Sequence, residues 1–164
     1  MLNPLSADSE RRTVKAVIQR VTGASVTTDG EMAGRVGQGL LILLGVMRDD
    51  TDEDALRLAE KIANLRIFSD ENGKMNRSLL DVGGSALVIS NFTLAANYRH
   101  GNRPDYFAGA APSEAKRLYE HFISLLSMKL PTECGVFGAD MQIEMTADGP
   151  VTIVMDSEVL KTKR

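Results

Sequence analysis

The chain has almost no cysteine and no long apolar run, and each absence excludes a class of protein. Cys134 is the one cysteine among 164 residues, so neither an intrachain disulfide nor a cysteine-based metal cluster is expected. A single thiol suits a reducing compartment and favours the cytoplasm. No apolar run reaches the roughly 18–20 residues of a membrane-spanning helix, and residues 1–13 lack the apolar core of a signal peptide. We therefore expect no membrane partner.

Common catalytic motifs are missing as well. The sequence contains no HExxH, no Cys-x-x-Cys, no Gly-x-Ser-x-Gly, no P-loop and no GxGxxG followed by an acidic residue. Its two histidines, His100 and His121, are too few and too loosely placed to argue for a Ser-His-Asp triad. The sequence therefore predicts no metal and no cofactor.

The chain also lacks an excess of positive charge, since its formal net charge is −3. Proteins that grip a long stretch of nucleic acid are usually basic. A nucleic-acid partner is therefore expected to be held through a local contact, such as a strand end. With 43% hydrophobic residues, a chain of this length can bury the core of one globular domain without disulfides or metals.

The pattern along the chain predicts a mixed α/β fold. Residues 1–13 are polar and are expected to form a disordered extension before a domain at 14–164. Helices are expected at about 52–64, capped by Thr51, and after Ser113, whose side chain can cap the second helix. Strands are expected at these ranges: 14–21, 24–28, 32–36, 40–46, 65–68, 86–89, 142–145 and 151–155. We expect two layers of largely antiparallel sheet, with the two helices covering one face.

Two stretches stand out within this pattern. Residues 86–94 read Ala-Leu-Val-Ile-Ser-Asn-Phe-Thr-Leu, a buried strand that ends in polar side chains. Such an end either runs into solvent or forms the floor of a pocket, because a buried polar group without a partner costs about 1–3 kcal/mol. Gly149-Pro150 lies between two predicted strands, which indicates a turn, and bonds before proline adopt cis far more readily than others.

The chain resembles the D-aminoacyl-tRNA deacylases of the bacterial and eukaryotic type, the D-tyrosyl-tRNA deacylase family. The resemblance runs from about Val14 to Asp156, and Val14 falls where the family's chains begin with methionine, which favours a natural start there. It rests on the order and spacing of these motifs: 18–21, 39–41, 44–46, 65–68, 73–76, 90–94, 101–104, 137–141 and 148–152.

The resemblance implies a homodimer that hydrolyses the ester between a D-amino acid and the 3′ end of tRNA. The family signatures Ser-Gln-Phe-Thr-Leu and Asn-x-Gly-Pro-Val-Thr fall on residues 90–94 and 147–152. One set of implied site residues is catalytic: Ser90, Asn91, Phe92 and Thr93. The other set selects the substrate: the Gly149-Pro150 peptide bond is cis, is held in place by Arg20 and reaches into the partner's pocket. There it acts as a filter that rejects L-amino acids. Such a filter does not exclude glycine, so glycyl-tRNA is also an expected substrate.

Two departures from the signatures keep other interpretations open. Asn91 stands where the family has Gln, and Ala147 stands where it has Asn. These changes favour an alternative, a module that binds a tRNA or DNA end without hydrolysis. A general small-ester hydrolase is a third interpretation, which the missing triad disfavours. Thr93 is expected either to act as nucleophile or to orient a water molecule; we favour the second because no base is evident.

Overall fold

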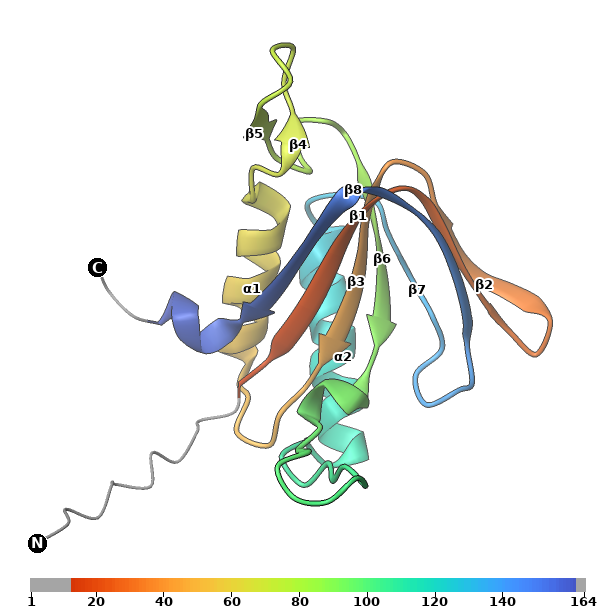
Figure 1. The fold of residues 1–164 in the computed structure, drawn as a ribbon, viewed down its shortest axis with the longest axis vertical. Coiled ribbons are helices and arrows are strands. Elements are labelled where there is room, and N and C mark those ends of the chain that lie inside the picture. Colours follow the sequence, from red (N-terminus) through yellow and green to blue (C-terminus); the bar gives the residue numbers. More distant parts are fainter. Residues whose placement is uncertain (1–12, 162–164) are drawn as a thin grey trace, which may run out of the picture.

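The computed structural model describes residues 13–161, and in it the sheet folds back over itself with both long helices on one outer face (Figure 1). The elements in chain order are β1 (Lys15–Thr28), β2 (Glu31–Val36), β3 (Gly39–Gly45), α1 (Asp52–Asn64), β4 (Phe68–Ser69), β5 (Met75–Arg77), β6 (Ser85–Ser90), the 3-10 helix η1 (Phe92–Ala95), α2 (Pro112–Ser127), β7 (Thr132–Cys134), β8 (Gln142–Asp156) and the 3-10 helix η2 (Ser157–Leu160).

The expected extension, residues 1–13, lies outside the described residues except for Thr13. The Thr13 side chain is buried, and its hydroxyl contacts Asp156 and accepts a hydrogen bond from the Glu158 N–H at 3.3 Å. Thr13 therefore packs with the folded domain.

Two long, bent strands organise the sheet. The first half of β1 pairs with β3, its second half pairs with β2, and β8 runs antiparallel along its other edge throughout. Register shifts at Gln19/Val21 and Val21/Gly23 mark the bend, where an irregular ladder lets a strand change direction. The separate strands expected at 14–21 and 24–28 are therefore one strand, and the turn expected at Gly149-Pro150 lies inside β8. β6 then joins β3 in parallel, and β7 joins β6.

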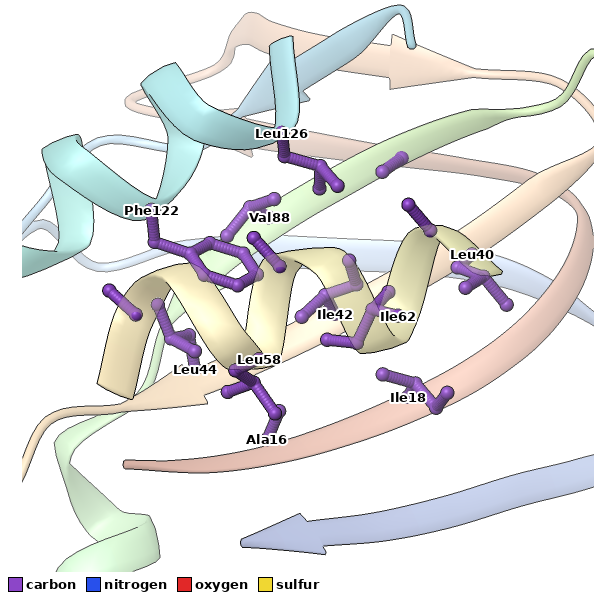
Figure 2. Packing of buried hydrophobic residues seen from close by; sticks show 14 of the residues in the cluster. Ala16, Ile18, Leu40, Ile42, Leu44, Leu58, Ile62, Val88, Phe122 and Leu126 are labelled. Carbon is purple, nitrogen blue, oxygen red and sulfur yellow. The ribbon is translucent and has the colours of Figure 1, made fainter. Parts of the chain in front are cut away.

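The bend creates two apolar cores on opposite faces of the sheet. The larger one lies between the sheet and the helices, where Phe122 of α2 and Leu58 of α1 meet Ile42 of β3 (Figure 2). The smaller core lies between the two layers of the bent sheet. It contains Val26, Leu87 and other residues of β1, β2, β3 and β6. The predicted two layers of sheet, with helices covering one face, are thus confirmed.

Some helix caps and strand boundaries differ from the prediction, because the segments that indicated them are only a few residues long. Thr51 forms the expected capping box with Asp54. The cap expected from Ser113 is wrong, because α2 begins one residue earlier at Pro112, whose missing N–H is harmless in the first turn. The predicted strand 65–68 is reduced to Phe68–Ser69, and β7 was not predicted, because three residues show no period.

A polar cluster joins the start of α1 to the end of the chain. Lys161 Nζ lies 2.8 Å from the buried carboxylate of Asp54, and the Ser157 hydroxyl donates to the same carboxylate at 3.1 Å. Asp50 lies beside this cluster, also buried, and accepts a hydrogen bond from the Met47 N–H. Burial raises the pKa of Asp50 to about 7, because its charged form is poorly solvated there.

The raised pKa of Asp50 predicts a pH-dependent loss of stability. The folded chain keeps this carboxyl protonated up to about pH 7, whereas the unfolded chain ionises it near the ordinary value of 3.8. Stability from this group is therefore full at low pH and is lost as pH rises between these values, by up to about 4 kcal/mol. Because Asn mimics the protonated acid, Asp50→Asn should gain stability over the wild type as pH rises.

Urea unfolding at about pH 4.5 and pH 8 measures this difference, with the exposed neighbour variant Asp49→Asn as control. A stability difference between Asp50→Asn and wild type that stays the same at both pH values would contradict the burial argument.

Candidate active site

The end of β6 changes direction at the polar stretch. Ala86 to Ile89 are buried between β3 and β7, and Ser90 is the last residue in register, opposite Leu44. The next N–H, of Asn91, still donates to the Leu44 carbonyl at 2.8 Å, and the chain then turns into η1. A Cβ on Gly45 would lie 2.8 Å from the Leu94 Cβ. Glycine at 45 therefore lets η1 pack against the end of β3.

Helix η1 presents side chains outward instead of continuing the strand. Phe92 and Thr93 are exposed, and the Thr93 hydroxyl donates to the Asn91 side-chain oxygen. The Phe92 ring meets the Tyr106 ring edge to face, with ring centroids 5.1 Å apart. Ser90, Asn91, Phe92 and Thr93 thus come together at one end of the sheet. The shorter amide of Asn91 finds its partner locally, in Thr93.

The backbone of η1 adds unused hydrogen-bond donors. The first N–H groups of a helix have no partner within it. Within residues 13–161, the N–H groups of Phe92 and Thr93 donate no hydrogen bond, whereas the Leu94 N–H bonds the Asn91 carbonyl at 3.3 Å. Two donors without a partner therefore lie at the start of η1, beside the Thr93 hydroxyl.

The second group of site residues lies in the middle of β8, where residues 148–151 fall outside the register with β1 and form a short loop, the Gly149-Pro150 loop. The Gly149-Pro150 peptide bond is cis, as the resemblance implies, and both residues are exposed. Arg20 holds the preceding residue: its Nε donates to the Asp148 carbonyl at 3.2 Å and lies 3.1 Å from the Asp148 carboxylate. Its Nη1 donates to the Ile67 carbonyl at 2.7 Å. With Ala147 unable to support the loop, Asp148 supplies the anchored side chain.

Gln19 supports the other side of this loop and was not singled out from the sequence. Its Nε2 donates to the Val151 carbonyl at 3.2 Å, and its Oε1 accepts from the Thr152 hydroxyl. The only sequence signal for this role is its place next to Arg20 in the motif at 18–21.

The structure places the two groups at opposite ends of the sheet. Arg20 pairs with Leu40 of β3, whereas Ser90 pairs with Leu44. Four residues along a strand span about 13 Å. Gly149-Pro150 and Thr93 of one chain are therefore too far apart to contact the same substrate atom, since contacting heavy atoms approach within about 4 Å.

The segment after β7 borders the same end of the sheet as η1. The Gly135 N–H donates to the Val88 carbonyl at 3.2 Å, two residues before Ser90. Tyr119 of α2 donates to the same carbonyl at 2.9 Å, and its ring lies 5.8 Å from that of Phe137. Burial raises the pKa of Tyr119, so its hydroxyl remains a donor. The motif at 137–141 carries part of the resemblance, but no local pattern in the sequence indicates that it lies beside the site.

Two broader features of the described residues bear on function. No three His, Cys, Asp or Glu side chains between residues 13 and 161 are grouped so that they could hold a metal ion. None of the helices in that range is both long and apolar enough to cross a membrane.

Known proteins share this sequence and fold over most of their length. A D-aminoacyl-tRNA deacylase of Ruegeria pomeroyi is 56% identical over 144 residues, 87% of this chain and 99% of that protein. Another, of Chloroflexus aurantiacus, is 56% identical over 152 residues, 92% of this chain and 95% of that protein.

Solved structures agree with these relatives. The c-Myc DNA unwinding element binding protein superposes with a TM-score of 0.82 at 39% identity, covering 87% of this chain and 97% of that one. A probable eukaryotic D-amino acid tRNA deacylase, at 16% identity and a TM-score of 0.76, shares the fold. The family model described as D-Tyr-tRNA(Tyr) deacylase matches residues 17–156. The resemblance seen in the motifs is thus confirmed, and the chain belongs to the D-aminoacyl-tRNA deacylase family.

Proposed function

We propose that this protein hydrolyses the ester between a D-amino acid and the 3′ end of tRNA, releasing free D-amino acid and tRNA, and that it works in the cytoplasm, where charged tRNA is used. The observation that carries the proposal is the arrangement at η1, where the Thr93 hydroxyl and two unused N–H groups lie together on an exposed turn. The identity of 56% to deacylases from two bacteria supports the same reaction.

The chemistry needs little from the protein because an aminoacyl ester is already reactive. Attack on the ester carbonyl places negative charge on its oxygen, and the N–H groups of Phe92 and Thr93 are suitable donors to that oxygen. Fixed donors of this kind stabilise the transition state without rearranging during the reaction. Positioning of the ester supplies a further part of the acceleration.

Thr93 orients the attacking water rather than attacking itself. A hydroxyl becomes a strong nucleophile when a base takes its proton. The Thr93 hydroxyl donates to Asn91, whose neutral amide oxygen is not a base. This hydrogen bond leaves the lone pairs of the hydroxyl free to accept from water, and the 2′-hydroxyl of the terminal ribose assists the attack. Ser90 ends β6 just before this turn, and the exposed ring of Phe92, packed against Tyr106, would border the bound ester.

Selection against L-amino acids requires a second subunit. Gly149 and Pro150 of the partner subunit would approach the ester at η1, because those of the same chain lie about 13 Å away along the strands. Backbone groups there are anchored through Asp148 by Arg20, whose side chain is 12% exposed. Anchored carbonyls would crowd an L side chain, and they leave room for a D side chain or for glycine.

The free edge of β8 supports a homodimer. β8 pairs with β1 on one side, and no strand within residues 13–161 pairs with its other side. It exposes Ile143, Met145 and Val154, the last at 76%. Long exposed apolar edges are sites of association, and a two-fold axis brings the same edge of both copies together.

A second candidate is a module that binds nucleic-acid ends without hydrolysis. It is favoured by the 39% identity to a protein named for binding DNA and by Asn91 in place of the family's Gln. A general ester hydrolase is the third.

Time courses with D-tyrosyl-, L-tyrosyl- and glycyl-tRNA separate these candidates. We expect the D ester and the glycyl ester to be hydrolysed and the L ester to persist, because the filter excludes only an L side chain. Hydrolysis of all three would indicate the general hydrolase, and hydrolysis of none would indicate the binding module. A protein active on the D ester but inert on glycyl-tRNA would contradict this form of the filter.

Thr93→Ala tests the role of the hydroxyl. We expect kcat on D-tyrosyl-tRNA to fall less than about tenfold, which is 1.4 kcal/mol, because water still attacks an ester held by the backbone donors. Thr93→Ser, which keeps the hydroxyl, serves as the matched control and should remain near wild type. A decrease above about a thousandfold, or an acyl-enzyme trapped by acid quench and seen by mass spectrometry, would show that Thr93 is the nucleophile.

Val154→Arg tests the subunit contact. The side chain is exposed in one chain, so the substitution should leave folding intact, whereas two like charges near a two-fold axis repel. We expect sedimentation to report monomers. Activity on D-tyrosyl-tRNA should fall in proportion to the fraction of dimer that is lost. Met128→Arg, at an exposed position of 75% just after α2, is the control and should remain dimeric. Full activity in a monomeric variant would contradict the shared site.

A further inference from the structure

The segment at 96–110 forms an exposed loop that is fixed beside η1. Asn97 and Asp105 pair through backbone hydrogen bonds of 2.8 and 3.0 Å, and the Asp105 carboxylate accepts from the Asn97 amide at 3.1 Å. Farther along, the Arg48 N–H donates to the Ala108 carbonyl at 2.9 Å. The Arg48 guanidinium also contacts the Phe107 carbonyl. These interactions hold the loop at the end of β3, next to the candidate active site.

Large aromatic rings are exposed on this loop. Tyr98 is 80% exposed and Phe107 is 78% exposed, although burying such rings would be favourable. Tyr106 contacts Phe92 of η1, so the rings continue from the active site onto the loop. An exposed group of large apolar side chains beside a site indicates a binding surface.

The same loop is positively charged in a chain whose net charge is −3. Its residues 97–107 include Arg99 and Arg103, and neither forms an ion pair within residues 13–161. Its single acidic residue, Asp105, is engaged with Asn97 and with the Phe107 N–H. The exposed charge of the loop is therefore available to a negatively charged partner.

We propose that this aromatic and basic surface, formed by Tyr98, Arg99, Arg103 and Phe107, binds the unpaired nucleotides that precede the terminal adenosine of the tRNA substrate. The proposal rests on the proposed function, which places the esterified adenosine at Thr93. Bases stack on exposed aromatic rings whatever their sequence, and arginines pair with the phosphates between them. A single strand leaving the pocket past Phe92 and Tyr106 would cross this surface.

Comparison of a full substrate with a truncated one tests the proposal. The substrates are D-tyrosyl-tRNA and D-tyrosine esterified to adenosine, which lacks the preceding nucleotides. For the double variant Tyr98→Ala/Phe107→Ala, we expect kcat/KM on the tRNA ester to fall roughly 5- to 150-fold per stacked base. Hydrolysis of the adenosine ester should stay at the wild-type rate. Met128→Ala, distant at the end of α2, is the control and should change neither.

Arg99→Gln/Arg103→Gln tests the charge. The slope of log KM against log salt should become shallower by about 0.7 for each phosphate that no longer pairs with an arginine. An equal decrease in hydrolysis of both esters, or no decrease on the tRNA ester, would overturn the proposal. A shift of the aromatic variant to monomers in sedimentation would also overturn it, because the rings would then belong to the subunit interface.

Filter binding of uncharged tRNA separates this proposal from the deacylase activity, because it requires no hydrolysis. A Kd that rises at least fivefold in the aromatic variant supports the surface even if wild-type protein leaves both esters intact. The latter result would overturn the proposed deacylase activity instead. An unchanged Kd would overturn the surface.

Discussion

The antiparallel pairing of β1 with β8 along the whole length of β1 is the constraint on which the structure depends. β1 also pairs with β3 and β2 on its other edge, so its register fixes three neighbours at once. The bend near Gly23 turns one sheet into two layers, and the inner apolar residues of β1, β2 and β6 then bury each other. The helices cover the opposite face, where most of the apolar burial occurs.

This pairing also explains why the candidate site is divided. β8 is held against β1 on one edge, so the loop at Gly149-Pro150 projects from the sheet near Arg20. β6 runs parallel to β3 and leads into η1 at the opposite end of the sheet. A chain with this topology carries both parts of a site but does not bring them together. Association through β8 is the arrangement that would complete each pocket, and this makes the dimer part of the proposed mechanism.

The candidate chemistry suits a site without strongly titrating groups. Asn91 and Thr93 are neutral, and the remaining donors are backbone N–H groups. Such a site does not need a carboxylate or histidine to be in the correct protonation state. The site also depends on the exact position of the backbone of η1. Gly45 allows η1 to approach β3 closely. The nearby loop of aromatic and arginine residues adds what the turn lacks, a surface for the rest of a polyanionic substrate.

The sequence by itself determined the family, the apolar strands, α1 with its Thr51 cap, and the two motifs that contain the candidate site residues. It could do so because periodicity, capping and motif spacing are local properties of the chain. The continuity of β1 through Gly23 and the short strand β7 were decided by tertiary structure. So was the contact by which Arg20 holds the Gly149-Pro150 loop, namely its hydrogen bond and ion pair to Asp148. Each depends on partners far away in sequence: Arg20 and Asp148 are 128 residues apart.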